Sequence, residues 1–293
     1  RMENFTQTLD TFSALNGDPI NVEQDTADTL PSLLATLKLS DNLQLRAAFA
    51  QTVNRPSMLE VSSGLWIDPQ SGDQFVGNPR LVAASIDHLD MRLEYYGGGS
   101  NSISLAYFNK DFTDPIERTL EVSSGSDTVV TFQNAQSATN SGIELDWRWD
   151  LEFLSSANYV FAVSGNYSVI ESDVVLPENN TEYSDSRSMQ GQSPYTANLM
   201  FTLDQDVWGI ESALIFNEIG ERITRVGQGD VPHVYEQPLS MLDLTLSKSF
   251  SDSKLSFKLK NILDEERLYT QGGEVYQKNK LGVGFSLGYS QSF

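Results

Sequence analysis

The side chains best suited to gripping a ligand lie in the long polar segments of the chain. Aromatic rings can stack on sugar rings, and guanidinium groups can form paired hydrogen bonds with oxyanions. The candidate contact residues are Trp66, Tyr183, Arg187, Arg222, Arg225, His233, Tyr235, Tyr269 and Tyr276. The aromatic members favour a glycan, whereas the arginines Arg187, Arg222 and Arg225 favour an anionic ligand. The acidic composition of these segments weighs against an anion.

No arrangement of residues predicts catalysis, a metal site or a bound cofactor. The chain has 293 residues and no cysteine, and its two histidines, His88 and His233, lie far apart in sequence. Thiolate metal sites, cysteine nucleophiles and paired-histidine metal sites are therefore not expected. The 40 acidic and 19 basic side chains give a net charge of −21, which argues against nucleic acid as a partner. We expect a protein that makes and breaks no covalent bond.

Strict alternation of apolar and polar residues predicts the elements that carry these side chains. From Ile143 to Leu151, odd positions are apolar and even positions are charged. A period of two residues is typical of β-strands with one apolar face. The expected strands are 1–12, 33–39, 43–49, 89–95, 103–107, 143–151, 159–163, 199–203, 208–217, 242–246, 255–259 and 281–293. These are about twelve strands of roughly ten residues, the length of a tilted strand that crosses a bilayer.

The connections between the expected strands alternate between short and long. Short turns occur at 40–42, 97–100, 204–206 and 251–253, and long polar segments cover 13–29, 52–83, 112–139, 171–190, 219–237 and 264–279. This asymmetry is typical of an all-β, transmembrane, antiparallel up-and-down β-barrel with short periplasmic turns and long outer loops. A soluble β-sandwich is the competing fold. Aromatic residues near strand ends disfavour it: Tyr95, Tyr96, Trp147, Trp149, Trp208, Tyr289 and Phe293.

Charged residues within the expected strands must face away from lipid. A Lys or Arg on the lipid face at the bilayer midplane costs about 2–4 kcal/mol. The predicted lumen-facing charges are Asp90, Arg92, Glu94, Glu144, Asp146, Arg148 and Asp150. They could contact an inner domain or line a solvent path. The simpler interpretation, solvated wall charges in mutual ion pairs, is favoured.

Several short segments, taken in order, carry a family resemblance. They include Asn54-Arg55-Pro56-Ser57, Gly77-Asn78-Pro79 and Lys260-Asn261-Ile262-Leu263-Asp264-Glu265. With these segments the chain resembles the C-terminal barrel portion of TonB-dependent outer-membrane receptors. It is most similar to the large receptors of Caulobacter, Xanthomonas and Alteromonas type, many of which take up oligosaccharides.

The resemblance implies a larger protein and a set of partners. Receptors of this class have 22 strands around a plugged lumen, so residues 1–293 would form the C-terminal part of the barrel, with the N-terminal plug and TonB box absent from this chain. A separate twelve-stranded barrel is the alternative. The implied location is the Gram-negative outer membrane, as an integral protein among lipid and lipopolysaccharide. The implied partners are the TonB complex, reached through the missing N-terminal part, the barrel-assembly machinery and a substrate-binding lipoprotein.

The C-terminal strand and the long loops would then have distinct roles. The strand resembles the signal read by the barrel-assembly machinery, through Phe285, Leu287, Tyr289 and Phe293. The function implied by the resemblance is TonB-dependent active transport of a scarce nutrient, an oligosaccharide or a ferric siderophore. A passive outer-membrane channel and a surface scaffold or adhesin barrel are the alternatives.

Overall fold

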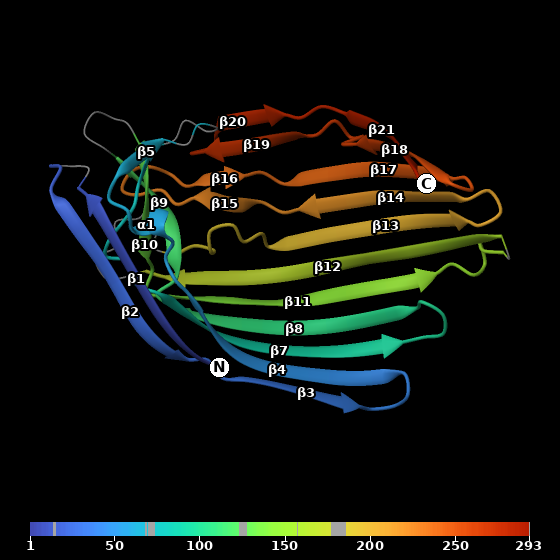
Figure 1. The fold of residues 1–293 in the computed structure, drawn as a ribbon, viewed down its shortest axis with the longest axis horizontal. Coiled ribbons are helices and arrows are strands. Elements are labelled where there is room, and N and C mark those ends of the chain that lie inside the picture. Colours follow the sequence, from blue (N-terminus) through green and yellow to red (C-terminus); the bar gives the residue numbers. More distant parts are fainter. Residues whose placement is uncertain are drawn as a thin grey trace.

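An antiparallel sheet of eleven strands dominates the fold (Figure 1). The structure is a computed structural model, which describes residues 1–13, 16–67, 69, 74–122, 128–156, 158–176 and 186–292. In chain order, the strands of this main sheet are β3 (Ser32–Lys38), β4 (Leu43–Asn54), β7 (Ala84–Tyr96), β8 (Ser102–Thr113), β11 (Ser137–Asp150), β12 (Tyr159–Val175), β13 (Tyr195–Gln205), β14 (Ile210–Ile219), β17 (Leu239–Ser249), β18 (Ser253–Lys260) and β21 (Gly284–Gln291). β3 and β21 are its edges. The predicted all-β, antiparallel fold class is confirmed.

The register of the main sheet separates an apolar face from a polar one. Leu45, Leu93, Leu105 and Leu145 lie opposite one another on four neighbouring strands. Leu93 and Leu105 are 40% and 51% exposed, and Leu45 and Leu145 are half-buried. A continuous apolar surface of this kind is favourable against hydrocarbon and unfavourable against water. The alternation in the sequence therefore corresponds to a face that suits lipid.

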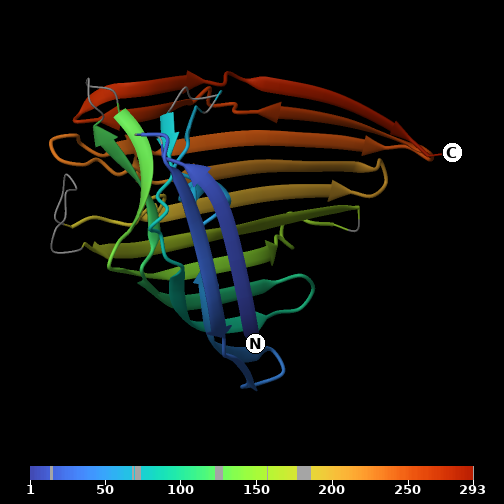
Figure 2. The ribbon, with the colours of Figure 1, turned by 60° about the vertical axis from the view of Figure 1, so that its left-hand side comes forward.

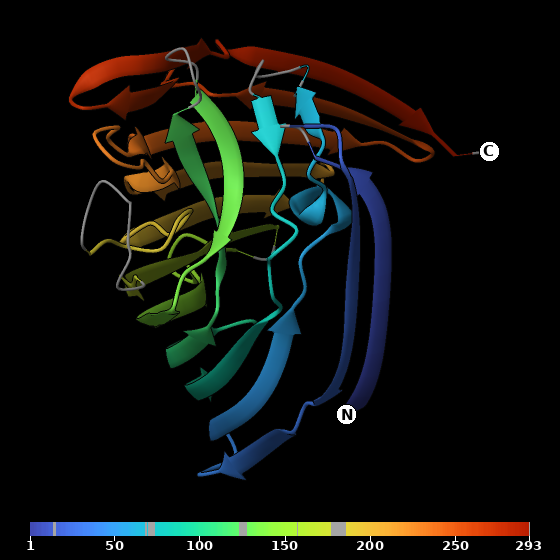
Figure 3. The same cartoon turned by 90° about the vertical axis from the view of Figure 1, so that its left-hand side faces the viewer.

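The main sheet curves into an open trough (Figure 2, Figure 3). Its short turns lie at one end of the strands and its long connections at the other, as predicted (Figure 1). At the short end, the turn from β7 to β8 closes with a hydrogen bond from Gly97 N to Asn101 O of 2.8 Å, and Gly99 has a φ of 68°. At the other end, which we call the long end, the connections form secondary structure of their own.

Three small groups of strands lie at the long end. β1 (Met2–Phe12) pairs with β2 (Pro19–Thr29), and a second sheet has the order β5 (Leu65–Ile67), β6 (Gln74–Val76), β10 (Thr128–Asn134) and β9 (Ile116–Val122). A third sheet has the order β15 (Arg222–Arg225), β16 (Val234–Glu236), β19 (Glu266–Gln271) and β20 (Glu274–Lys280). An isolated parallel bridge between Thr119 and Val226 joins the second sheet to the third.

The expectation of a spanning strand at 1–12 followed by a loop at 13–29 is wrong. Both segments contain strands, and they form a hairpin apart from the main sheet. Val22 is 5% exposed and belongs to the apolar core of the long end, against which Leu9 packs. The alternation in 1–12 therefore reflects packing within the long end instead of contact with lipid. Eleven of the twelve expected strands lie in the main sheet.

The segments that carry the family resemblance have structural roles at the long end. Arg55 Nη1 and Nη2 bind Glu3 Oε1 and Asp28 Oδ2 at 2.9 and 2.5 Å, which ties the β1–β2 hairpin to the chain after β4. Ser57 caps the short helix α1 (Met58–Val61), where a capping box is present. A Cβ at Gly77 would lie 2.4 Å from Ser62 O, so only glycine fits there.

The segment at 260–265 forms a tight corner between β18 and β19. Asn261 has a φ of 53° and is buried. Its Nδ2 donates to Glu265 O at 3.1 Å and Gly282 O at 3.2 Å, and its backbone N–H donates to Asp243 Oδ1 at 2.8 Å. Asparagine tolerates this left-handed conformation better than most residues because its short polar side chain can bond locally.

Among the described residues, no helix is long and apolar enough to cross a membrane.

Candidate functional site

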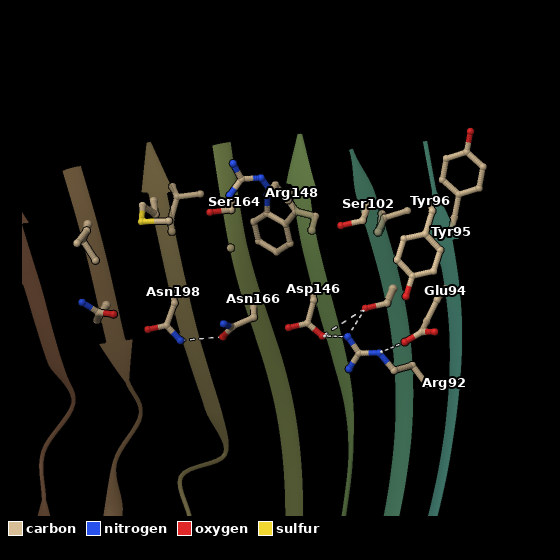
Figure 4. Close-up of a pocket in the computed structure, with 18 residues that line it drawn as sticks. Arg92, Glu94, Tyr95, Tyr96, Ser102, Asp146, Arg148, Ser164, Asn166 and Asn198 are labelled. Atoms are coloured by element: carbon tan, nitrogen blue, oxygen red, sulfur yellow. Dashed lines mark hydrogen bonds and ion pairs between the residues drawn. The ribbon is translucent and has the colours of Figure 1, made fainter. Parts of the chain in front are cut away.

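Polar side chains form a continuous row across the polar face of the main sheet (Figure 4). Each member lies opposite the next on the neighbouring strand. The row, which we call the polar row, consists of Gln44, Glu94, Ser104, Asp146, Asn166, Asn198 and Asn217. Asn198 Nδ2 donates to Asn166 Oδ1 at 2.7 Å. A hollow of about 470 Å³ is lined by every member of this row except Gln44.

An ion-pair network occupies one half of the polar row. Arg92 Nε lies 3.1 Å from Glu94 Oε1, and Arg92 Nη2 lies 3.1 Å from Asp146 Oδ2 and 2.8 Å from Ser104 Oγ. Glu94 Oε2 also accepts from Gln44 Nε2 at 2.5 Å and lies 3.1 Å from Arg46 Nε. The carboxylate of Glu94, which is only 6% exposed, therefore separates two arginines that lie directly opposite each other.

All seven charges predicted to face a lumen lie on the polar face. Arg92 and Glu144 both lie opposite Ala106 of β8, so they share one face of the sheet. Asp90 and Gly142 likewise both lie opposite Phe108. The members Asp90, Arg92 and Glu94 alternate with apolar residues of β7, as Glu144, Asp146, Arg148 and Asp150 do with those of β11. Asp150 is held at the short end, where it accepts from Ser100 Oγ at 2.6 Å. This face can bind polar groups by hydrogen bonds and charge.

A second hollow, of about 570 Å³, lies at the long end against the third sheet. It brings together four predicted contact residues, Arg222, Arg225, Tyr269 and Tyr276. Arg225 Nη1 donates to Tyr276 Oη at 2.8 Å, and its guanidinium carbon lies 5.3 Å from the centre of that ring. We call this feature the arginine hollow.

Other residues of the arginine hollow were not predicted as contacts. Arg118 of β9 and Arg267 of β19 line it, with Gln190 and the buried carboxylate of Glu236. Arg222 Nη2 lies 2.7 Å from Glu236 Oε2, and Arg267 Nε lies 3.1 Å from Glu236 Oε1. Arg118 and Arg267 lie in long polar segments of the sequence. The criterion that selected Arg222 and Arg225, an arginine in such a segment, would have selected them as well.

The remaining predicted contact residues have other environments. Trp66 stacks on Phe75 with ring centres 4.2 Å apart, within the packing of the long end. His233 is 3% exposed, and its ring meets that of Tyr235 edge to face at 6.2 Å. Tyr183 lies outside the described residues. These placements give Trp66 and His233 packing contacts that a ligand would have to displace.

Arg187 is also buried, in an ion pair with Glu117. Its Nη2 lies 2.6 Å from Glu117 Oε2 and its Nη1 lies 3.1 Å from Glu117 Oε1. Gln190 N donates to the same carboxylate at 3.1 Å. With side-chain exposures of 2% and 6%, Arg187 and Glu117 present little surface to a ligand.

His233 lies close enough to this pair to be affected by it. Burial, helped by the positive charge of Arg187, lowers the pKa of the His233 imidazole below its usual 6.5, and Glu117 opposes the effect. His233 Nδ1 accepts from Gly227 N at 2.9 Å, which requires that nitrogen to be unprotonated. The β15–β16 connection therefore holds a neutral histidine.

Two further predictions concern metal binding and the C-terminal strand. In the described ranges, no group of three or more His, Cys, Asp or Glu side chains could hold a metal ion. Phe285, Leu287 and Tyr289 of β21 lie on one face of the strand and are 80%, 70% and 64% exposed. Phe293 lies outside the described residues.

Comparison with known proteins agrees with this architecture. A family model described as "TonB dependent receptor-like, beta-barrel" matches residues 1–262. No curated protein matches the sequence.

Several solved structures share the fold. A ferric enterobactin receptor variant from Pseudomonas aeruginosa has a TM-score of 0.61 at 16% identity, over 94% of this chain and 42% of that one. The siderophore receptor PirA from Acinetobacter baumannii has a TM-score of 0.63 at 14% identity, over 94% and 43%. The ferric yersiniabactin uptake receptor FyuA from Yersinia pestis has a TM-score of 0.61 at 21% identity, over 96% and 40%. The chain thus spans less than half the length of these proteins.

Proposed function

The chain belongs to the TonB-dependent receptor-like β-barrel family, and we propose on that basis that it forms the C-terminal wall of a transporter in the Gram-negative outer membrane. The full protein would take up a scarce nutrient by energy-coupled transport and would catalyse no covalent reaction. The observation that carries this proposal is the two-faced main sheet. One face is apolar and exposed, and the other carries the polar row beneath a hollow.

In this proposal, the two ends of the sheet have different roles. The long end captures the nutrient outside the cell, and the polar face lines the lumen through which it passes. The TonB complex acts on the full protein through a plug and a TonB box, and a substrate-binding lipoprotein covers the loops. The apolar face contacts lipid and lipopolysaccharide, while β21 and Phe293 present the signal to the barrel-assembly machinery.

The arginine hollow favours a ferric siderophore as the nutrient. Four arginines and two tyrosines there suit an anionic, partly aromatic chelate. The similar solved structures include receptors for ferric enterobactin and ferric yersiniabactin, which supports the same class. The proposed contact set also includes Trp66 of β5, Tyr235 of β16 and Tyr183.

An oligosaccharide is the second candidate for the nutrient. The half of the polar row made by Asn166, Asn198 and Asn217 carries uncharged amides. Amides both donate and accept hydrogen bonds, as sugar hydroxyl groups require. These amides could therefore bind a neutral, polyhydroxylated solute as it passes along the polar row.

Growth of a strain that lacks the gene tests the two nutrient classes. If the nutrient is a ferric siderophore, the deletion strain grows poorly when iron is limiting and normally on defined oligosaccharides. If the nutrient is an oligosaccharide, the defect appears on that carbon source. A complemented strain is the control. If the deletion strain shows neither growth defect, both assignments are contradicted.

Electrical recording separates the transporter from the passive-channel and scaffold alternatives. Full-length protein in a planar bilayer should show low conductance because a plug fills the lumen. A large, steady single-channel conductance would instead favour a passive channel. A deletion that abolished adhesion without an uptake defect would favour a scaffold or adhesin barrel.

A further inference from the structure

We infer that Arg148 selects solutes by charge where two hollows of the polar face meet, on a passage that leads along the main sheet to the short end. The passage favours negatively charged solutes in transit over positively charged ones of similar size. This inference rests on the proposed function, because it names the strands and the residue that act on the solute inside the lumen. Its test measures charge selectivity, which is separate from energy coupling.

The two hollows follow one another along the same three strands. The hollow of about 470 Å³ at the polar row, which we call the middle hollow, is lined by Ser164 of β12, Met200 of β13 and Ile215 of β14. The next residues toward the short end on the same face are Ala162, Thr202 and Ala213. These line a hollow of about 720 Å³, which we call the short-end hollow. The two hollows therefore form one passage along β12, β13 and β14.

Arg148 of β11 lies at the junction, since it lines both hollows. On its two neighbouring strands it lies opposite Ser102 and Ser164. Serine side chains are too short to cover a guanidinium, and Arg148 is exposed. Its guanidinium points toward Ser164, away from the ion-pair network (Figure 4). A solute that moves from the middle hollow to the short-end hollow must pass this charge.

The charge of Arg148 is not compensated by a partner. The other two arginines of the main sheet belong to the ion-pair network, whereas Arg148 has no ion pair among the described residues. The carboxylates beside it on β11 are engaged elsewhere: Asp146 Oδ2 lies 3.1 Å from Arg92 Nη2, and Asp150 accepts from Ser100 Oγ at 2.6 Å. A fixed positive charge in a lumen favours anions, and low-dielectric walls strengthen its field.

Arg148 also decides the net charge of the passage. The other charged residues of the middle hollow have a net charge of −1: Arg92, Glu94 and Asp146. The other charged residues of the short-end hollow balance: Lys254, Lys258, Asp204 and Glu211. Arg148 therefore makes the middle hollow neutral and the short-end hollow positive, in a chain whose net charge is −21. Without Arg148, neither hollow would favour an anion.

The test measures how fast single cysteines react with thiol reagents of opposite charge in intact cells that produce the full-length protein. Residues 1–293 include no cysteine, and protein without the introduced cysteine gives the background rate. Ser164→Cys places the thiol directly opposite Arg148, with Cβ atoms about 5 Å apart. Ser256→Cys, the matched control, lies in the short-end hollow on β18, five strand spacings or about 24 Å from β11. The reagents are sulfonatoethyl and trimethylammonioethyl methanethiosulfonate.

The ratio of the negative-reagent rate to the positive-reagent rate should depend on Arg148. In the Ser164→Cys protein, Arg148→Gln should lower this ratio at least roughly fivefold, because one unit charge about 5 Å away changes the local concentration of each reagent about fourfold in water. Arg148→Lys retains the charge and should retain the ratio. In the Ser256→Cys protein, Arg148→Gln should have no effect, since the distance exceeds two Debye lengths at physiological salt.

Two results of the labelling would overturn the inference. One is an unchanged ratio when Arg148→Gln is added to the Ser164→Cys protein. The other is a Ser164→Cys protein that reacts with neither reagent in energised cells, which would mean that another part of the full protein fills the passage. Heat-modifiable mobility on gels checks that each variant is folded.

A bulky substitution tests the route itself. Ala213→Trp fills part of the short-end hollow and should reduce uptake of the labelled nutrient severalfold. Ala48→Trp is the matched control, because Ala48 lies on the polar face at β4, outside both hollows. Equal uptake by the two folded variants would contradict a passage along β12, β13 and β14.

A strain that lacks TonB separates this inference from the proposed function. If the reagent ratio depends on Arg148 while uptake does not depend on TonB, energy-coupled transport is rejected and the inference stands. If uptake depends on TonB while the ratio does not depend on Arg148, the inference is rejected and the proposed function stands.

Discussion

Arg187 and Glu117 form a doubly hydrogen-bonded ion pair that is almost completely buried, although they lie 70 positions apart in the chain. The pair joins β9 to the connection between β12 and β13. Gln190, which also binds Glu117, extends the link to Thr224 of β15. One buried pair therefore holds three of the long connections together.

Removal of one partner of this pair should loosen the long end. Arg187→Met leaves the Glu117 carboxylate buried without its guanidinium, which costs about 3–5 kcal/mol. Hydrogen exchange should rise in 116–120 and 186–192 and stay unchanged in the main sheet. The double variant Arg187→Met/Glu117→Leu should recover part of the protection. Unchanged exchange in the single variant would mean that the pair does not join these connections.

Gly77 should tolerate no side chain. Gly77→Ala places a Cβ 2.4 Å from Ser62 O and 2.5 Å from Leu59 O, so backbone must shift at a cost of about 1–3 kcal/mol. Limited proteolysis should cut the variant faster near α1. Gly98→Ala is the matched control, since its Cβ would meet nothing within 4 Å. Equal proteolysis of the two variants would contradict the close packing.

Acid should weaken the long end through His233. Because the pKa of the folded-state imidazole lies below 6.5, the unfolded state takes up a proton more readily. Above about pH 6.5 the imidazole is neutral in both states, so the lowered pKa does not change the free energy of unfolding. Below about pH 6.5 the free energy of unfolding falls as the pH drops. The exchange rates of the amide hydrogens in 222–236, corrected for the intrinsic rates, should therefore rise as the pH is lowered from about 7.5 to about 5.5. His233→Gln should abolish this part of the pH dependence, whereas His88→Gln, which alters the other histidine of the chain, should retain it.

The stability of the main sheet should depend more on Glu94 than on the other charges of its polar face. Glu94→Gln weakens the bonds to Arg46 and Arg92 and leaves these two cations opposite each other. We expect a loss of about 1–3 kcal/mol in the free energy of unfolding, measured by guanidinium titration of tryptophan fluorescence. Asp90→Asn, at an exposed position on the same face, should cost less than about 0.5 kcal/mol. Similar losses in both variants would show that the network adds no stability.

Alternation was sufficient to predict the main sheet because a strand between lipid and a polar lumen must alternate at nearly every position. The same signal misled at residues 1–12, since Phe5 and Leu9 face neighbouring loops instead of lipid. Local pattern does not reveal which apolar surface covers a strand.

The candidate site was harder to predict because its parts come from distant connections. Arg222 and Arg225 could be selected by residue type, but Arg118 comes near them through tertiary contacts: the bridge between Thr119 and Val226, and Gln190, which binds both Arg118 N and Thr224 O. Arg187 has the same residue type and a similar sequence context, yet its guanidinium is buried against Glu117. Tertiary pairing decides which arginines face a ligand.

Uptake of labelled ligand by intact cells tests the central claim most directly. Cells that produce the full-length protein should accumulate the labelled nutrient identified by the growth experiment, and accumulation should collapse when the TonB gene is disrupted or the proton gradient is dissipated. Undiminished accumulation under either condition would contradict energy-coupled transport through this wall and would favour a passive channel.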